Sequence, residues 1–287
     1  MSLVAERCWF RGAGGALIHF DARDARGLRS LDPPGIVLTV HGLGEHLGKY
    51  GSWLDFVAEA GWHATAFDLR GHGHTPGRRG HFDFPDLVDD LADFVDVTRD
   101  RYPGLPVFVV GHSLGALVAI RYATTTETPA VAGLALSSPP IELVRVYPRW
   151  YRWGIQALDR IAPWAPIPRG TDPARLTRDP ERVEAIRRDP LASRVISARG
   201  MLSTGAAIEA IGAGAGRLTL PLLVLVAEDD AITRPDSTLA WCRETGSTDV
   251  MAGKVAGAYH EILNDLGRES AWRRILAWCE ARTGAVS

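Results

Sequence analysis

Short apolar runs alternate along the chain with stretches whose apolar residues recur at helical spacing. Six runs rich in Val, Ile and Leu are predicted to be strands: 35–40, 63–67, 107–110, 131–136, 222–227 and 250–255. Such runs suit strands that are buried on both faces of a parallel sheet. Residues 8–20 predict an opening antiparallel hairpin with three glycines in its turn. The pattern indicates an α/β fold with a mostly parallel central sheet flanked by helices.

Three other stretches are predicted to be helices that cover this sheet. Trp53, Phe56, Val57 and Ala60 share one helical face, and Gly61 follows at the position of a C-terminal cap. A second apolar stripe runs through 87–98, with aspartates in its early turns and arginines at its end, as the helix dipole favours. A third stripe lies within 272–279.

The alternation stops between about 140 and 216, where the chain becomes helical, arginine-rich and aromatic. Apolar residues at 150, 153, 157, 161 and 164 follow a helical stripe, which the prolines at 163, 166 and 168 end. We expect this stripe to pack against the rest of the protein, to shelter an acyl chain, or both. The chain is therefore predicted to have a core of residues 1–139 and 217–287 and a helical cap, or lid, of residues 140–216.

Charge and cysteine content narrow the possible partners. The formal net charge of −2 provides no basic field for nucleic acid, so none is expected as a partner. Within this total the 140–216 segment carries +4, which favours transient contact with an anionic membrane surface. The three cysteines form no metal-binding or disulfide pattern, and no apolar run is long enough for a signal peptide or membrane span. These features predict a cytoplasmic protein, peripheral to a membrane at most.

The strongest chemical signal is VFVVGHSLGALVAI, in which Gly111, Ser113 and Gly115 form a GxSxG between a predicted strand and a predicted helix. A sharp strand-to-helix turn exposes such a serine as a nucleophile, and its flanking glycines avoid collision with neighbouring backbone. The amide of Leu114, at the start of the helix, is a predicted oxyanion donor. The alternative is a serine that only caps the helix.

A serine nucleophile needs a histidine base and a carboxylate that orients it. The strand at 222–227 leads into Asp229 and Asp230, and either aspartate fits the position of the acid. We favour Asp230 because it begins a loop that Pro235 can end by starting a helix. His260 is the only histidine after this acid and is the predicted base.

A second oxyanion donor is expected from a loop after an earlier strand. HGLG at 41–44 follows the 35–40 run, and its glycines allow the amide of Leu43 to turn toward the reacting carbonyl. The alternative is an ordinary glycine-rich turn. The histidines of DLRGHGHTPGRRGHF at 68–82 lie among glycines that give ligands no rigid frame, so we favour a structural turn in which Asp68 and Arg70 tie loops together.

Taken together, these motifs resemble the monoacylglycerol lipase and lysophospholipase branch of the α/β-hydrolase superfamily. The resemblance rests on HGLGEHLGKY at 41–50, DLRGHGHTPGRRG at 68–80, GHSLGA at 111–116, LTRDPERVEAIRRDPL at 176–191 and GAYHEILND at 257–265. It implies Ser113, Asp230 and His260 as a catalytic triad, Leu43 and Leu114 as oxyanion amides, and a helical cap over an apolar tunnel. It also implies that Glu45 and Lys49 contact the alcohol portion of the substrate.

The sequence therefore predicts a serine hydrolase that cleaves the carboxylic ester of a small amphiphilic single-chain lipid, either a monoacylglycerol or a lysophospholipid. No metal or organic cofactor is expected. Other reactions on this fold remain as alternatives: hydrolysis of small esters, carbon–carbon hydrolysis, perhydrolysis and aminopeptidase-like cleavage. A further alternative is a receptor that keeps the scaffold without catalysis.

Overall fold

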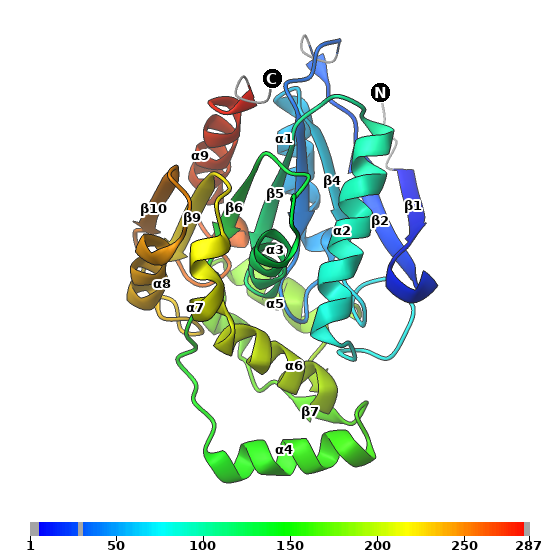
Figure 1. Cartoon of the computed structure of the whole chain (residues 1–287), viewed down its shortest axis with the longest axis vertical. Coiled ribbons are helices and arrows are strands. Elements are labelled where there is room, and N and C mark those ends of the chain that lie inside the picture. The colour runs from blue at the N-terminus through cyan, green and yellow to red at the C-terminus, as the bar shows by residue number, and fades with distance from the viewer. Residues whose placement is uncertain (1–5, 28–30, 284–287) are drawn as a thin grey trace.

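A computed structural model describes residues 6–27 and 31–283 of the chain. Its described residues form an eight-stranded sheet in the order β1-β2-β4-β3-β5-β6-β9-β10 (Figure 1). The strands are β1 Glu6–Arg11, β2 Leu17–Arg23, β3 Ile36–Val40, β4 His63–Phe67, β5 Val107–His112, β6 Gly133–Ser137, β9 Leu222–Ala227 and β10 Val250–Val255. From β4 to β10 all neighbouring pairs are parallel, whereas β2 is antiparallel to β1 and β4. The predicted mostly parallel α/β sheet is confirmed.

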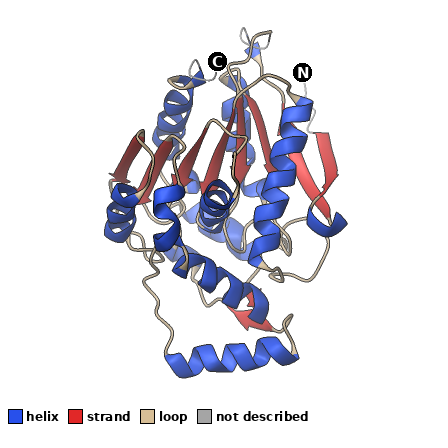
Figure 2. Ribbon diagram, viewed as in Figure 1, coloured by secondary structure: helices blue, strands red, loops and turns tan. Residues whose placement is uncertain are grey.

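The two faces of the sheet bury different helices, because successive strand residues point in opposite directions. In β5, Val107 and Val109 join the cluster that packs against α2 and α3, whereas Phe108 and Val110 join the cluster under α1 and α9. The core helices are α1 Gly51–Glu59, α2 Phe84–Arg101, α3 Leu114–Thr125, α8 Pro235–Trp241 and α9 Arg268–Glu280. Figure 2 shows the strands enclosed between these layers.

Local sequence signals explain how several elements begin and end. Gly61 follows α1 with a φ of 87°, the left-handed conformation that glycine adopts without strain. The predicted opening hairpin is confirmed as the antiparallel pair β1 and β2, and a short 3₁₀ turn, Ala13–Gly15, joins them. Further 3₁₀ turns are Leu47–Tyr50, Pro173–Arg175, Ala215–Arg217, Cys242–Glu244 and Ile262–Asn264.

Residues 138–221, called here the β6–β9 segment, leave the sheet and return to it. The segment contains α4 Arg149–Ile161, β7 Pro166–Pro168, α5 Pro180–Arg188, β8 Val195–Ser197, α6 Ala198–Glu209 and α7 Ile211–Gly214. β7 and β8 pair only with each other. Figure 1 shows α4 at one end of the molecule, beyond α6. No described helix has both the length and the apolar character of a membrane span.

The predicted helical stripe of this segment forms α4, but its aromatic residues do not face inward. Trp150 and Trp153 are 70% and 63% exposed, whereas Ile155 is buried. The expectation that this stripe packs inward or shelters an acyl chain is therefore wrong for these two tryptophans. The physical reason is that α4 contacts the rest of the protein through another side of the helix, on which Ile155 lies.

Candidate active site

Ser113 lies at the sharp turn between β5 and α3. Its φ of 50° and ψ of −114° are unfavourable for a residue with a side chain. A Cβ on Gly111 would lie 2.7 Å from the Cα of Ala116, and a Cβ on Gly115 would lie 2.2 Å from the Val40 carbonyl oxygen. The two glycines of GxSxG therefore allow the strand, turn and helix to approach closely.

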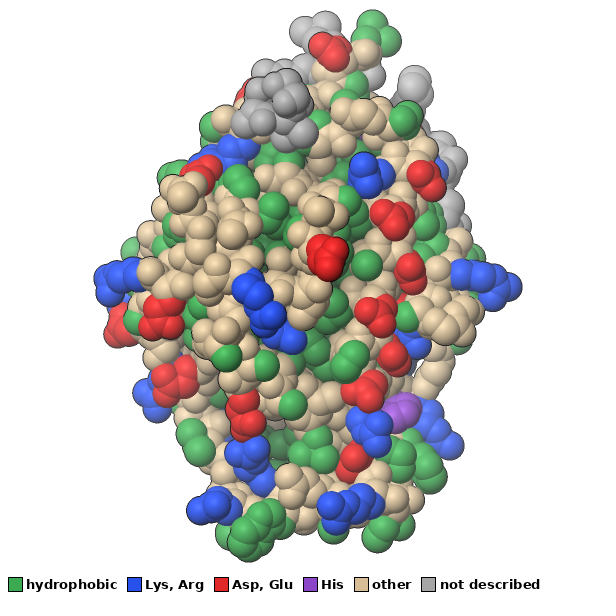
Figure 3. Space-filling model, viewed as in Figure 1, with side chains coloured by type: hydrophobic (Ala, Val, Ile, Leu, Met, Phe, Trp, Pro, Cys, Tyr) green, Lys and Arg blue, Asp and Glu red, His purple; other side chains and the backbone are tan. Residues whose placement is uncertain are grey.

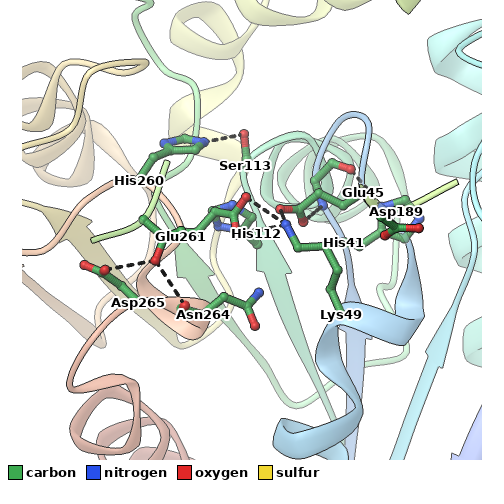
Figure 4. Close-up of polar contacts among 12 residues, drawn as sticks. His41, Glu45, Lys49, His112, Ser113, Asp189, His260, Glu261, Asn264 and Asp265 are labelled. Atoms are coloured by element: carbon green, nitrogen blue, oxygen red, sulfur yellow. Dashed lines mark hydrogen bonds and ion pairs between the residues drawn. The ribbon is translucent and has the colours of Figure 1, made fainter. Parts of the chain in front are cut away.

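The structure brings Ser113, His260 and Asp230 together from three loops. His260 Nε2 lies 3.0 Å from Ser113 Oγ, as Figure 4 shows, and His260 Nδ1 lies 2.8 Å from Asp230 Oδ2. Burial raises the pKa of Asp230, but the charge and hydrogen bond of His260, with two backbone amides, lower it to about 2. The carboxylate is thus ionised at neutral pH, so Nδ1–H donates to it and Nε2 can accept the serine proton.

The loop after β9 distinguishes the two neighbouring aspartates. The Asp230 carboxylate accepts hydrogen bonds from the amide of Ile232 at 2.8 Å and from the amide and hydroxyl of Thr233 at 3.0 and 2.7 Å. Asp229 is exposed, and its amide donates to the Ala258 carbonyl. The structure therefore brings Asp230, not Asp229, to His260.

The two predicted oxyanion amides belong to segments that adjoin the nucleophile. Leu114 is the first residue of α3, so its amide has no acceptor within the helix. Gly42 lies so close to the serine that a Cβ on it would be 3.3 Å from the Ser113 Cβ, and Leu43 follows it. His41 orders this loop, because its Nε2 accepts from the Leu69 amide while its Nδ1 donates to the Gly42 carbonyl.

Glu45 and Lys49, the residues that the resemblance assigns to the alcohol portion, form part of a buried charged cluster. Lys49 Nζ lies 2.8 Å from Glu45 Oε1 and 2.8 Å from Glu261 Oε1 (Figure 4). Glu45 Oε2 also accepts hydrogen bonds from the Tyr50 hydroxyl at 2.7 Å and from the Gly42 amide at 3.0 Å. Through Glu45, the cluster therefore holds the backbone of Gly42, the residue before the predicted oxyanion donor Leu43.

The carboxylates of this cluster are held in different electrostatic states. Burial opposes ionisation of Glu45, but the charge of Lys49 keeps its pKa well below the ordinary value. Burial, together with the charge of Glu45, raises the pKa of Glu261 to about 7 although Lys49 opposes the shift. The site therefore holds one ionised carboxylate and one that changes its protonation near neutral pH.

Sequence reasoning missed Glu261, His112 and Ser138. Glu261 and His112 have the simple signal of standing next to a predicted catalytic residue. The His112 ring lies 5.0 Å from the His260 ring, and burial lowers its pKa to about 4, so it is neutral at pH 7. Ser138 has a φ of 46°, and its hydroxyl donates to the His260 carbonyl at 3.0 Å, which fixes the backbone of the histidine.

The histidine-rich loop is tied together by Asp68 and Arg70. Asp68 accepts hydrogen bonds from the amides of Leu47 and His74, each at 2.8 Å, and its pKa is about 2. Arg70 pairs with the buried Asp90 at 2.6 Å. The predicted structural role of the loop is confirmed. Within the described residues no group of three or more His, Cys, Asp or Glu side chains is arranged to hold a metal ion.

Comparisons with known proteins identify a family and several similar lipases. The model of the family described as "Serine aminopeptidase, S33" matches residues 32–267. The chain is 30% identical to the phospholipase YtpA of Bacillus subtilis, over 86% of this chain and 96% of that protein. It is 30% identical to a monoacylglycerol lipase of Mycolicibacterium smegmatis, over 94% and 95% of the two chains. A crystal structure of the Paleococcus ferrophilus monoacylglycerol lipase superposes with a TM-score of 0.82 at 32% identity, covering 92% of this chain and 99% of the other.

Proposed function

Since this chain belongs to the α/β-hydrolase family described as serine aminopeptidase, S33, we propose that it hydrolyses the carboxylic ester of a single-chain lipid. The observation that carries the proposal is the continuous hydrogen-bonded series from Ser113 through His260 to Asp230. Relatives named as a phospholipase and a monoacylglycerol lipase support a lipid ester over a peptide. The substrate is a monoacylglycerol or a lysophospholipid.

The reaction follows from the positions of these groups. His260 Nε2 takes the proton of Ser113 as Oγ attacks the ester carbonyl, and the amides of Leu43 and Leu114 donate to the developing oxyanion. The Asp230 carboxylate stabilises the imidazolium. His260 then protonates the departing alcohol, which leaves an acyl-Ser113 intermediate. A water molecule that His260 deprotonates attacks the acyl carbonyl, and the ester bond to Ser113 breaks. His260 returns the proton to Ser113 Oγ as the fatty acid is released. No step requires a metal or organic cofactor.

The buried cluster gives the alcohol portion of the substrate a polar environment. We place the glycerol hydroxyl groups beside Glu45 and Lys49, whose charges are already matched within the protein. Hydroxyl groups can exchange hydrogen bonds with such a pair without leaving a charge unpaired. Glu261 belongs to the same environment through its contact with Lys49.

Residues 140–216 act in this proposal as a cap that is continuous with the oxyanion loop. The Ser193 amide donates to the Gly44 carbonyl at 3.0 Å, and His46 Nε2 lies 2.7 Å from Asp189 Oδ2. The outer helix α4 presents Trp150 and Trp153 to solvent, next to arginines, which suits transient contact with an anionic lipid surface. We propose that the enzyme is cytoplasmic and peripheral to a membrane.

Labelling by a fluorophosphonate probe, followed by hydrolysis of a substrate panel, tests the proposal. The wild-type protein should be labelled and should cleave monoacylglycerols and lysophospholipids faster than aminoacyl amides. Ser113→Ala should remove the label and the hydrolysis without changing the unfolding temperature by more than a few degrees. A folded wild type that takes no label would instead indicate a receptor, and preferential cleavage of the amides would indicate an aminopeptidase.

A further inference from the structure

Arg169 directly follows β7 in the β6–β9 segment, and its side chain contacts the HGLG loop at 41–44. Its Nη1 donates to the Ser193 carbonyl at 2.9 Å. Its guanidinium lies directly against Gly44, whose φ is 78°, in the place that a Cβ would otherwise occupy. The absence of a side chain at Gly44 therefore makes room for this cation beside the loop that carries Leu43.

This guanidinium has no carboxylate within ion-pair distance among the described residues. Five other arginines of the same segment do have one: Arg152, Arg178, Arg187, Arg188 and Arg199. Burial lowers the pKa of Arg169, although Glu45 and Glu261 oppose the shift. The residue nevertheless keeps part of its surface accessible. A deeply placed cation with free donors and access to solvent is suited to bind an anionic ligand.

Arg169 lies near the residues that the proposed function assigns to the alcohol portion of the substrate. Gly42 adjoins Ser113, and Gly44, which Arg169 contacts, stands two residues further along the same loop. The charges of Glu45 and Glu261 act on both Arg169 and Lys49. The Arg169 guanidinium thus borders the charged cluster where the proposed function places the glycerol.

A second unpaired cation lies toward the surface. Arg145 Nη1 is 3.6 Å from the position that a Cβ on Gly170 would take, and Gly170 directly follows Arg169. The Arg145 guanidinium stacks over the Tyr147 ring at 4.8 Å and has no carboxylate within ion-pair distance in the described part of the chain. Although 24 positions separate Arg145 from Arg169 in the sequence, the exposed guanidinium of Arg145 lies beside Gly170, the neighbour of Arg169. Two positive charges in this part of the molecule attract an anion toward the deeper one.

We propose that Arg169 binds the phosphate of a lysophospholipid headgroup while Ser113 attacks the ester of the same molecule. The assignment rests on the proposed function and selects the phosphate-bearing class among its substrates. A planar guanidinium donates two parallel hydrogen bonds to a phosphate, and the phosphate of a glycerophospholipid lies only a few bonds from the ester. Glu45 and Glu261 do not prevent binding, because Lys49 neutralises one of these charges and Glu261 can take up a proton near neutral pH.

Calorimetry on the Ser113→Ala protein tests this site without requiring hydrolysis. The ligands are an ether-linked alkylglycerol phosphate, the alkylglycerol without phosphate, and glycerol 3-phosphate without the alkyl chain. Arg169→Gln should lower affinity for the alkylglycerol phosphate at least about tenfold more than affinity for the alkylglycerol. Glycerol 3-phosphate should bind more weakly than the alkylglycerol phosphate, because it lacks the buried chain.

Two further variants make the result decisive. Arg274→Gln removes the same charge from the exposed face of α9, away from α4 in Figure 1, and should leave both affinities unchanged. Arg169→Lys, which keeps the charge but loses the bidentate geometry, should give an intermediate affinity for the phosphate ligand. It also remains informative if Arg169→Gln does not fold.

Two calorimetric results would contradict the phosphate site. Equal losses for both alkyl ligands in Arg169→Gln would show that the arginine only holds the β6–β9 segment on the oxyanion loop, and unchanged affinities would show no role. Either result overturns the phosphate site. If the wild type hydrolyses monoacylglycerol in the substrate panel used to test the proposed function, that function survives the loss of the phosphate site. If phosphate binding depends on Arg169 but the wild type hydrolyses no lipid, the phosphate site stands and the hydrolase proposal fails.

Discussion

Two neighbouring aspartates after β9 have different surroundings, and the difference predicts different roles. Asp230 accepts hydrogen bonds from His260, Ile232 and Thr233, whereas Asp229 is exposed. Asp230→Asn should lower kcat by about 10³ to 10⁴-fold, because the amide no longer stabilises the imidazolium or the correct tautomer. Steady-state hydrolysis measures the effect. Asp229→Asn is the matched control and should retain near wild-type kcat; a comparable loss in that variant would contradict the assignment.

The sequence predicts the order of these side chains and favours Asp230, but it does not show what surrounds each of the two aspartates. The strand-to-helix motif identifies Ser113, and position alone selects His260, the last histidine of the chain. Asp229 and Asp230 have the same residue type and adjoin each other, so only the local path of the backbone after β9 separates them. The Asp230 carboxylate turns inward, where the amides of Ile232 and Thr233 order it.

Glu261 links the active site to a pH dependence of stability. Burial and the charge of Glu45 raise its pKa from 4.5 to about 7, so the folded protein holds a proton there that the unfolded chain releases. The contribution of this proton to the free energy of unfolding is fully present below pH 4.5 and is lost as pH rises through about 7. Glu261→Gln should reduce this decrease by on the order of 2 kcal/mol. Denaturant unfolding at pH 5 and pH 7.5 measures it.

The matched control for this titration is Glu269→Gln. Glu269 is exposed and pairs with the exposed Arg273 on the surface of α9, so its replacement should leave the pH profile unchanged. Equal slopes in the wild type and Glu261→Gln would show that another group titrates. The sequence gives little warning of this cluster, because 212 positions separate Lys49 from Glu261.

At the scale of whole elements, the strands were predictable because their residues are apolar on both faces. All residues of β3 and β5 are buried, and both observed strands lie close to the predicted bounds. The short β7 and β8 were not predicted. Pro166 and Pro168 stand at the two ends of the three-residue β7, where prolines more often signal a break in regular structure.

Packing of α3 against β3 depends on Gly115. A Cβ there would lie 2.2 Å from the Val40 carbonyl oxygen, and this backbone oxygen cannot move without disturbing the sheet. Gly115→Ala should therefore destabilise the protein by about 1–3 kcal/mol or more and slow fluorophosphonate labelling of Ser113, because the turn before α3 must shift. Chemical denaturation and labelling rates provide the two measurements.

Gly154 in α4 provides the opposite case. Apart from its own helix backbone and its chain neighbours, no heavy atom lies within 4 Å of a Cβ at this position, so Gly154→Ala should stabilise the protein by up to ~1 kcal/mol through helix propensity alone. Destabilisation by both substitutions to a similar degree would show that the close approach to Val40 is not the cause.

At the scale of the whole molecule, periodicity predicted that α4 would form but not which way it faces. A helical stripe identifies an apolar face of a helix. The surface on which that face packs depends on the path of the segments that connect the helix to the sheet. Trp150, Trp153 and Ile161 are exposed, and the positively charged β6–β9 segment places arginines beside them. Figure 3 shows hydrophobic and Lys or Arg side chains together at the end of the molecule where α4 lies.

This end of the molecule should bind anionic vesicles. Replacing Trp150 and Trp153 together by Ala should lower partitioning onto phosphatidylglycerol vesicles at least about tenfold, because two large apolar side chains no longer enter the lipid interface. Sedimentation with vesicles measures the partitioning, and fluorophosphonate labelling in solution checks that the site is intact. Raising the salt concentration should weaken vesicle binding by the wild type, because salt screens the attraction between the exposed arginines and the anionic lipids.

Trp9→Ala provides the control, because Trp9 is 47% exposed but lies on β1, away from α4 in Figure 1. Its loss should leave vesicle binding unchanged if the orientation of α4, rather than total aromatic exposure, determines the contact. Equal partitioning of the wild type and the α4 double variant would remove α4 from the interface. Equal binding to neutral and anionic vesicles at every salt concentration would assign the contact to the tryptophans alone, without the segment's positive charge.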